Sequence, residues 1–292
     1  MGPDLYYALG GGLGHLTRAR AVLATLGVRA RVLAPARHAQ APESSPGLDL
    51  LPLPVELTDR PGDLGAWLAG LLWEQRPRRL WLDSFPCGLF GELCGLPLPP
   101  ELEIHYLARL LRWDRYARRI QGEPPPLTRV HLLEPLNQDH ADWLARRGAE
   151  PIALRLETPD LPPPTDAMAR LAALPPPCWL VAHSGPAEEI RELLDYARDL
   201  AAAEGVSPAL ILIAPRALPY CAPDVVRLHA NPARALYPQA ARIITACGFN
   251  TMSETLAYRG IHRFLPMTRA LDDQYSRAAR RREAQEESPA TE

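Results

Sequence analysis

Apolar runs of strand length alternate with longer amphipathic segments through the first half of the chain. We expect buried strands at residues 5–9, 31–33, 48–53, 79–82, 103–107 and 130–133. Helical spacing of apolar residues predicts helices over 16–26, 64–74 and 139–147. Strands and helices that alternate at this interval are typical of a parallel α/β sheet.

The second half repeats this pattern after a break. Residues 149–166 lose periodicity and collect prolines, which indicates a hinge. Beyond it we expect strands at 179–182, 209–214, 225–228, 242–246 and 264–265, and helices at 186–203, 251–258 and 275–282. The pattern predicts two Rossmann-like domains, 1–158 and 159–285, whose parallel sheets face a central cleft, and a disordered tail, 286–292.

The composition excludes several functional classes of protein. The 292 residues are 47% hydrophobic and 23% charged, which is ordinary for a soluble protein of two domains. A formal net charge of −2 offers no basic surface for nucleic acid. All 32 basic residues are arginine, so the chain has no lysine for a P-loop or a pyridoxal Schiff base. The 5 cysteines lack C-x-x-C spacing and predict reduced thiols in a cytoplasmic protein.

The hydrophobic pattern predicts no membrane span. No apolar run approaches the roughly 18 residues of a spanning helix, and the first residues do not read as a signal peptide. The apolar stretch 64–73 precedes Arg76, Arg78 and Arg79, which leaves two interpretations. A helix packed on the sheet is favoured, whereas an interfacial anchor would give peripheral contact with the inner face of the membrane.

A glycine-rich turn, 10–14 (GGGLG), follows the first expected strand and precedes His15. It departs from G-x-G-x-x-G because His15 stands where the third glycine belongs, and no acidic residue ends the second strand, so a dinucleotide site is disfavoured. An imidazole with a pKa near ~6.5 accepts a proton efficiently at neutral pH, which makes His15 a candidate catalytic base. The alternative is a histidine that caps the helix or is hydrogen-bonded to a backbone carbonyl. Asp83, at the end of its own strand, either orients His15 or caps a turn at 84–86.

The stretch 242–274 combines a short buried strand, a glycine turn at 247–250 and a helix start. Such an arrangement directs free N–H groups and the positive end of a helix dipole at one place, which suits an anion. The simpler interpretation is a capping box, because 251–254 (TMSE) fits T-x-x-E. A second short strand ended by Pro266 and the polar cluster 272–274 (DDQ) complete the stretch.

In this order, these features resemble the donor-binding half of the GT-B glycosyltransferases, and they are most similar to the MurG-like family. The run 12–18 (GLGHLTR) is similar to the N-terminal loop of that family and of a related nucleotide-sugar hydrolase, PseG. The resemblance implies that turn amides hold the donor diphosphate, at Gly248, Phe249, Asn250 and Thr251.

The same resemblance implies further roles. Glu254 would bind the ribose hydroxyls of the donor, and Asp273 and Gln274 would face the transferred sugar. The N-terminal loop would cradle acceptor or phosphate groups with Gly11, Gly12 and Gly14.

Two other places in the second half are candidates for the donor phosphates. Ser184 and Gly185 precede a helix, so they either meet the phosphates at its N-terminus or simply cap it. The MurG-like family usually has a more glycine-rich loop here. Arg216 could neutralise diphosphate charge as a planar fork, although a solvated loop arginine is the simpler interpretation.

We therefore expect an inverting glycosyltransferase that moves a sugar from a nucleotide-diphospho-sugar, UDP-linked, to an acceptor hydroxyl. The chain has no D-x-D pair, so we expect a metal-independent reaction without other cofactors. The acceptor is open between a lipid-linked molecule and a small one. Two alternatives remain: a PseG-like hydrolase that activates water with His15, and a non-catalytic nucleotide-sugar-binding protein, which a contact between His15 and Asp83 would disfavour.

Overall fold

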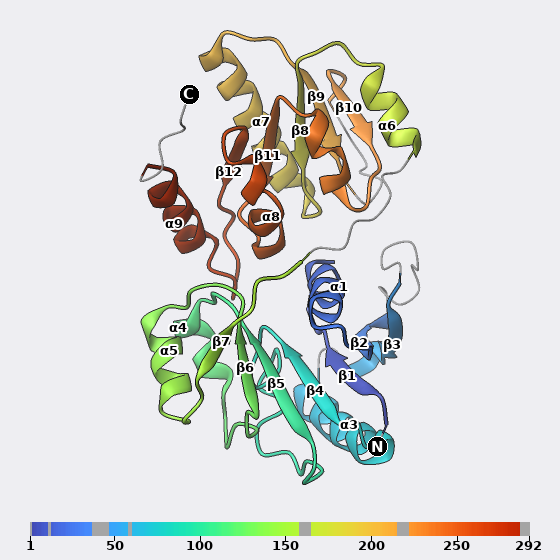
Figure 1. Cartoon of the computed structure of the whole chain (residues 1–292), viewed down its shortest axis with the longest axis vertical. Coiled ribbons are helices and arrows are strands. Elements are labelled where there is room, and N and C mark those ends of the chain that lie inside the picture. The colour runs from blue at the N-terminus through green and yellow to red at the C-terminus, as the bar shows by residue number, and fades with distance from the viewer. Residues whose placement is uncertain are drawn as a thin grey trace. The chain divides into compact units, whose positions relative to one another are not determined.

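The structure, a computed structural model, describes residues 2–10, 13–36, 47–57, 60–157, 165–214 and 222–286. The chain forms two compact units. Unit 1 contains Met1–Pro159 and Ala270–Asp272, and unit 2 contains Asp160–Arg269 and Asp273–Glu292. Each unit is built on its own parallel sheet (Figure 1). The parallel α/β architecture predicted for both halves is confirmed.

Unit 1 holds a seven-stranded sheet with the order β3-β2-β1-β4-β5-β6-β7. Its strands are β1 (Asp4–Tyr7), β2 (Ala30–Pro35), β3 (Asp49–Leu53), β4 (Arg79–Asp83), β5 (Glu103–Ala108), β6 (Arg129–Leu132) and β7 (Pro151–Ala153). The chain builds outward from β1 to β3 on one side and then restarts with β4 on the other. The reversal between β1 and β4 is the topological switch point, where ligands of such sheets bind beyond the carboxyl ends of the strands.

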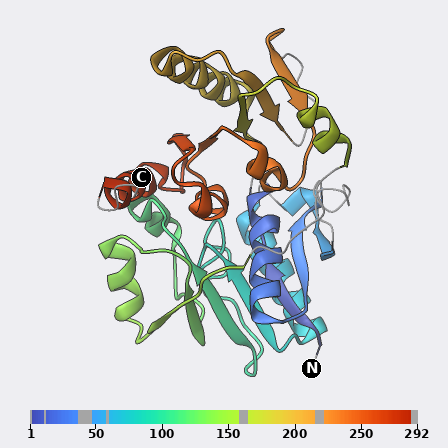
Figure 2. The ribbon, with the colours of Figure 1, turned by 45° about the horizontal axis from the view of Figure 1, so that its top comes forward.

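Helices cover both faces of this sheet: α1 (Gly14–Leu26), α3 (Pro61–Gln75), α4 (Trp113–Tyr116) and α5 (Gln138–Ala145). Successive residues of a strand point to opposite faces. Leu5 of β1 accordingly packs in the same core as α3, whereas Tyr6 packs in the core that contains α1. In Figure 2, α1 lies in front of the strands. It ends at Gly27, whose φ of 62° is the left-handed conformation of a helix C-cap.

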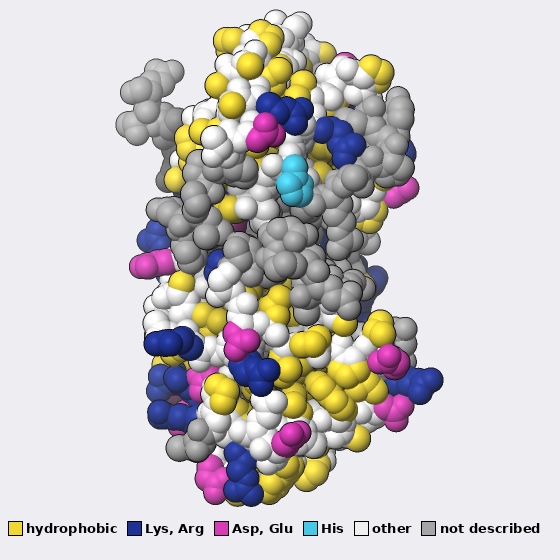
Figure 3. All heavy atoms as spheres, turned by 90° about the vertical axis from the view of Figure 1, so that its right-hand side faces the viewer, with side chains coloured by type: hydrophobic (Ala, Val, Ile, Leu, Met, Phe, Trp, Pro, Cys, Tyr) yellow, Lys and Arg dark blue, Asp and Glu magenta, His cyan; other side chains and the backbone are white. Residues whose placement is uncertain are grey.

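The apolar stretch 64–73 belongs to α3 and packs on the sheet. Leu64, Leu68 and Leu72 are buried in the core of unit 1. Trp73 stays 41% exposed on the outer side of the helix. Figure 3 shows apolar side chains on this part of unit 1, with scattered charges of both signs among them. Within the described residues, no helix combines the length and the apolarity that crossing a bilayer requires.

Unit 2 holds a five-stranded sheet with the order β10-β9-β8-β11-β12. Its strands are β8 (Cys178–Ala182), β9 (Ala209–Ile213), β10 (Val225–Leu228), β11 (Arg242–Ala246) and β12 (His262–Leu265), and its helices are α6 (Thr165–Ala172), α7 (Ala187–Glu204), α8 (Phe249–Glu254) and α9 (Gln274–Glu286). Val181 packs in the core with α7, and its neighbour Leu180 packs on the opposite face with α6. The switch point lies between β8 and β11.

Several sequence expectations need correction. The segment 149–166, expected to be a hinge that lacks periodicity, contains β7, and α6 begins at Thr165. All three residues of β7 are exposed, so the strand has no hydrophobic signature that periodicity could detect. Pro186 is the N-cap of α7 and not its first helical residue. Of the expected tail 286–292, Glu286 is the last residue of α9 and the others lie outside the described residues.

The capping box at 251–254 is also wrong. The helix α8 begins at Phe249, and Gly248 is its N-cap, without a side-chain hydrogen bond. Thr251 is therefore the third helical residue, where its carbonyl accepts a hydrogen bond from the amide of Thr255 (3.0 Å). A capping box needs the threonine at the N-cap, so Glu254 is not fixed by that motif.

Candidate functional site

Two candidate catalytic residues meet at the switch point of unit 1. His15 is the second residue of α1, which follows β1, and Asp83 is the last residue of β4. The imidazole Nδ1 of His15 is hydrogen-bonded to Oδ2 of Asp83. The carboxylate of Asp83 is fully buried, whereas 13% of the His15 side chain is exposed. The carboxyl ends of β1 and β4 thus bring together two residues that are far apart in the sequence.

Arg18 completes this cluster and was not among the residues expected from sequence. Its Nε donates to Oδ1 of Asp83 (2.5 Å) and its Nη2 donates to Oδ2 (2.7 Å). Burial alone would raise the pKa of Asp83, but Arg18 and His15 outweigh burial and hold this pKa well below its usual range. Asp83 is therefore an ionised carboxylate that makes a bidentate pair with the Arg18 guanidinium.

The ionised carboxylate decides which nitrogen of His15 carries the proton. A carboxylate can only accept hydrogen bonds, so the proton sits on Nδ1 and Nε2 keeps its lone pair. Burial is the main influence on the pKa of His15 and lowers it, outweighing the opposite effect of Asp83. His15 is therefore neutral at neutral pH, with Nε2 as a proton acceptor that has no hydrogen-bond partner among the described residues.

Gly10 makes room for this imidazole. A Cβ at Gly10 would lie 2.0 Å from Nε2 of His15 and 2.2 Å from Cδ2, so any other residue at this position would displace the imidazole. Gly10 was not among the glycines to which the sequence pattern assigned a role. Of the glycines that were assigned one, Gly14 is the exposed first residue of α1, and Gly11 and Gly12 lie outside the described residues.

In unit 2, the start of α8 follows the carboxyl end of β11. A Cβ at Gly248 would meet no atom within 4 Å, so there is open space beside the N-cap. The first turn of α8 contains no acidic residue that would occupy the positive end of the helix. Phe249 is 8% exposed and buried, whereas Asn250 and Thr251 are partly exposed.

Glu254 lies at the end of α8 and is partly exposed. Its carboxylate is close to Tyr237, whose pKa is raised first by burial and then by this negative charge. Tyr237 belongs to the 3-10 helix Ala233–Gln239, which precedes β11.

The start of α7, beyond β8, is different. Glu189 lies in the first turn of α7, accepts hydrogen bonds from Arg269 and contacts Nε2 of His183 (2.7 Å). A Cβ at Gly185 would lie 2.3 Å from His183 Nε2, so a larger residue there would displace the His183 and Glu189 side chains. Glu189 thus places a negative charge at the positive, N-terminal end of the α7 dipole. Ser184 is exposed beside it, and Arg216 lies outside the described residues.

Asp273 and Gln274 both make hydrogen bonds that shape the chain locally. Asp273 accepts from the amide (3.0 Å) and the hydroxyl (2.7 Å) of Ser276, as an N-cap does. Gln274 is buried, and its Oε1 accepts from the amides of Cys247 (3.1 Å) and Met267 (3.0 Å). Gln274 therefore ties together the segments that follow β11 and β12.

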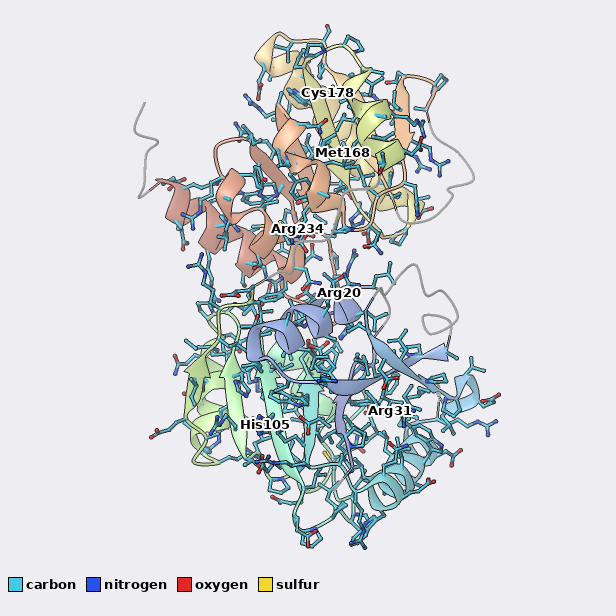
Figure 4. All side chains as sticks on the ribbon, turned by 45° about the vertical axis from the view of Figure 1, so that its right-hand side comes forward. Arg20, Arg31, His105, Met168, Cys178 and Arg234 are labelled. Carbon is cyan, nitrogen blue, oxygen red and sulfur yellow. The ribbon has the colours of Figure 1, made fainter. Side chains whose placement is uncertain are left out.

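Most of the other histidines that the structure describes are buried: His105, His131, His140 and His262. Nδ1 of His105 on β5 lies 3.2 Å from Nε2 of His131 on β6, and His105 is labelled in Figure 4. Among the described residues, no three His, Cys, Asp or Glu side chains come together as a metal site would require. The described cysteines are free thiols: Cys87, Cys94, Cys178 and Cys247.

Comparisons with known proteins identify the fold. No family model and no curated protein matches the chain. Among solved structures, the spinosyn rhamnosyltransferase SpnG complexed with thymidine diphosphate is 18% identical, with a TM-score of 0.61 over 97% of this chain and 84% of that one. The spinosyn forosaminyltransferase SpnP is 16% identical, with a TM-score of 0.59 over 100% and 87%. The S. aureus MnaA–UDP structure is 11% identical, with a TM-score of 0.58 over 94% and 81%.

Sequence identities this low show a shared fold and do not show a shared activity. The similarity extends over both units, and both sheets have the parallel doubly wound order described above. The chain has the two-domain α/β fold of the GT-B glycosyltransferases.

Proposed function

We propose that the protein is a glycosyltransferase that moves a sugar from a nucleotide-diphospho-sugar to an acceptor hydroxyl with inversion at the sugar carbon. The observation that carries the proposal is the contact between His15 and Asp83 at the switch point of unit 1. It presents an Nε2 lone pair that has no hydrogen-bond partner among the described residues, at the edge where sheets of this kind bind ligands. The same contact counts against a protein that only binds nucleotide sugars.

In the proposed reaction, His15 is the general base. Its Nε2 takes the proton of the acceptor hydroxyl while the oxygen attacks C1 of the donor sugar. The bond from C1 to the diphosphate oxygen breaks on the opposite side, and the diphosphate leaves with the electron pair. Asp83 holds the imidazole by Nδ1–H and stabilises the imidazolium that forms. The imidazolium then returns its proton to solvent.

On the donor side, we propose that the diphosphate binds the amides at the start of α8. Support comes from the open space beside Gly248 and from the absence of an acidic residue in the first turn. The start of α7 suits this role less well because Glu189 is already there. Glu254 would accept hydrogen bonds from the ribose hydroxyls, and UDP is the expected nucleotide. Two of the similar structures are described as complexes with thymidine diphosphate and with UDP.

We further propose that the reaction needs no metal, because helix amides supply the neutralising charge. The MurG-like character of 242–274 and the nature of the acceptor, lipid-linked or small, belong to this proposal as well. Chelator should then leave the transfer rate unchanged.

Incubation with UDP- and dTDP-sugars, first without and then with candidate acceptors, tests the proposal. A transferase leaves the donor intact until an acceptor is present, and then releases nucleoside diphosphate and a glycosylated product. Free sugar without acceptor would identify a hydrolase instead, and conversion of the donor to its epimer would identify an epimerase. Binding without turnover under any of these conditions would contradict an enzymatic role.

A further inference from the structure

Ser84, directly after Asp83, has a backbone conformation that its residue type disfavours. Its φ is 73°, in the left-handed region where glycine is the usual residue. The side chain is completely buried. A non-glycine residue held in this region stores strain, which persists only where the surroundings impose it. The hydroxyl that glycine would lack must therefore contribute something at this position.

The hydroxyl of Ser84 joins two arginines. Its Oγ accepts hydrogen bonds from Nη2 of Arg18 (2.9 Å) and from Nε of Arg109 (2.7 Å). Arg18 is the same residue that grips Asp83 through both carboxylate oxygens. The conformation of Ser84 is thus linked through one guanidinium to the carboxylate that holds His15.

Arg109 continues the chain of contacts. It follows β5 and is 6% exposed, and its Nη1 donates to Oδ1 of Asp272. Asp272 belongs to the short segment Ala270–Asp272 that packs with unit 1. The amide of Arg112 donates to the carbonyl of Leu271 (2.8 Å), and the Leu271 side chain is part of the core of unit 1. Asp272 is therefore fixed in place and not a loose counter-ion.

The charges in this cluster alternate. Arg18 of α1 and Arg109, after β5, are cationic, and Asp83 of β4 and Asp272 are anionic. The positive charge of Arg109 is one of the influences that lower the pKa of His15, after burial and Arg18. Tyr6 of β1 is also nearby, and its phenol pKa is raised by burial and by Asp83. Asp272 thus offsets a cation that would otherwise act on Asp83 and His15 unopposed.

We propose that Ser84, Arg109 and Asp272 form a positioning relay that fixes Asp83 and, through it, the imidazole of His15. None of the three needs to touch the substrate. The relay depends on the proposed function in one respect, which is that His15 acts as the general base. Its effect on the imidazole can be measured without any reaction.

The test is the titration of His15 by NMR in the full-length labelled protein, with the His15→Asn variant to identify the signal. In Asp272→Asn the cationic charge of Arg109 loses its counter-charge, so the pKa of His15 should fall. In Arg109→Gln a cation disappears, so the pKa of His15 should rise. The opposite directions matter because a general loosening of the structure would not produce both.

A control variant shows whether the effect on His15 is specific to the relay. Asp63→Asn removes an exposed carboxylate of α3 that pairs with Arg60 at 3.9 Å, and it should leave the titration of His15 unchanged. If Arg109→Gln fails to fold, Asp272→Asn alone decides the test. This substitution should fold, because asparagine has nearly the shape of aspartate and the Asp272 side chain is 17% exposed. A His15 pKa that is unchanged in Asp272→Asn, or that rises, overturns the relay.

Kinetics separates this inference from the proposed function. Asp272→Asn should lower kcat by up to about 10²-fold with little change in KM, because the base is misplaced and substrate binding is not. Asp272→Glu should recover part of the loss. If the titration shifts as expected and no sugar transfer occurs with any donor, the relay stands and the proposed function fails. If transfer occurs and the titration is unaffected, the relay fails and the function stands.

Discussion

At the residue scale, the candidate base is defined by its immediate neighbours more than by its own identity. The imidazole of His15 occupies space that a Cβ at position 10 would fill, and its Nδ1 contacts a carboxylate that Arg18 keeps ionised. Burial favours the neutral imidazole, and the orientation of Asp83 selects the tautomer. Substituting any of these neighbours should alter the chemistry of His15 although residue 15 itself remains a histidine.

Gly10→Ala tests this directly. The added Cβ would lie 2.0 Å from Nε2, so the imidazole must move and lose its alignment with Asp83. We expect kcat to fall by about 10²-fold, while calorimetry shows unchanged nucleotide binding. Gly70→Ala in α3 is the matched control, because a Cβ there meets no atom within 4 Å. Full turnover in Gly10→Ala would show that the position of His15 does not matter.

Sequence reasoning found part of this site. His15 and Asp83 could be predicted from the sequence because each stands at the end of a recognisable strand or glycine turn. Arg18, Ser84 and Arg109 were not, because their roles depend on hydrogen bonds between residues that are more than 20 positions apart, such as Arg18 and Ser84. Nothing in the amino-acid type of a buried arginine tells which carboxylate it will meet.

At the element scale, the short helix α8 carries the donor side of the proposal. It begins at Phe249, two residues earlier than its sequence pattern predicts, so Thr251 is helical and the N-cap is the half-buried Gly248. The T-x-x-E spacing was misleading because local capping rules compete with the tertiary position of the strand end. Strands with strong apolar runs, such as β9, were placed nearly correctly, whereas the exposed edge strand β7 was not detectable.

Glu254→Gln tests the donor side. The carboxylate is proposed to accept ribose hydrogen bonds, and bonds to a charged group contribute about 1.5–3 kcal/mol. We expect nucleotide affinity, measured by calorimetry, to fall by about 10- to 100-fold. Glu283→Gln, an exposed position on α9, is the control. Equal affinity in wild type and Glu254→Gln would remove Glu254 from the donor site.

At the whole-molecule scale, both units bury neutral histidines. Burial lowers the pKa of His131 to about 4 and the pKa values of His140 and His262 to about 3, with nearby positive charges adding to the effect at His131 and His262. Because the unfolded chain binds these protons near pH ~6.5, the stability is complete above that pH and is lost as pH falls toward the folded values. The protein should therefore be fully stabilised by these histidines at neutral pH and lose stability as the pH falls below about 6.5.

His140→Phe tests this expectation, because His140 is stacked on Trp113 with ring centroids 3.9 Å apart and a phenyl ring keeps that packing. Each such histidine should account for about 2 kcal/mol of unfolding free energy lost between pH 6.5 and 5. The variant should lose correspondingly less over this interval in calorimetric unfolding. The exposed His229→Gln is the control and should behave as wild type. An equal loss in His140→Phe and wild type would contradict a neutral buried His140.

The fold, the switch points and the His15–Asp83 contact together make sugar transfer the central claim, and His15→Ala tests it most directly. Initial rates of transfer and donor affinity should be measured on the same preparation. We expect turnover to fall by about 10²–10⁴-fold, because the acceptor hydroxyl loses its base. Donor affinity by calorimetry should stay as in wild type, because the proposed donor site lies in unit 2. Unchanged turnover in His15→Ala would contradict the account.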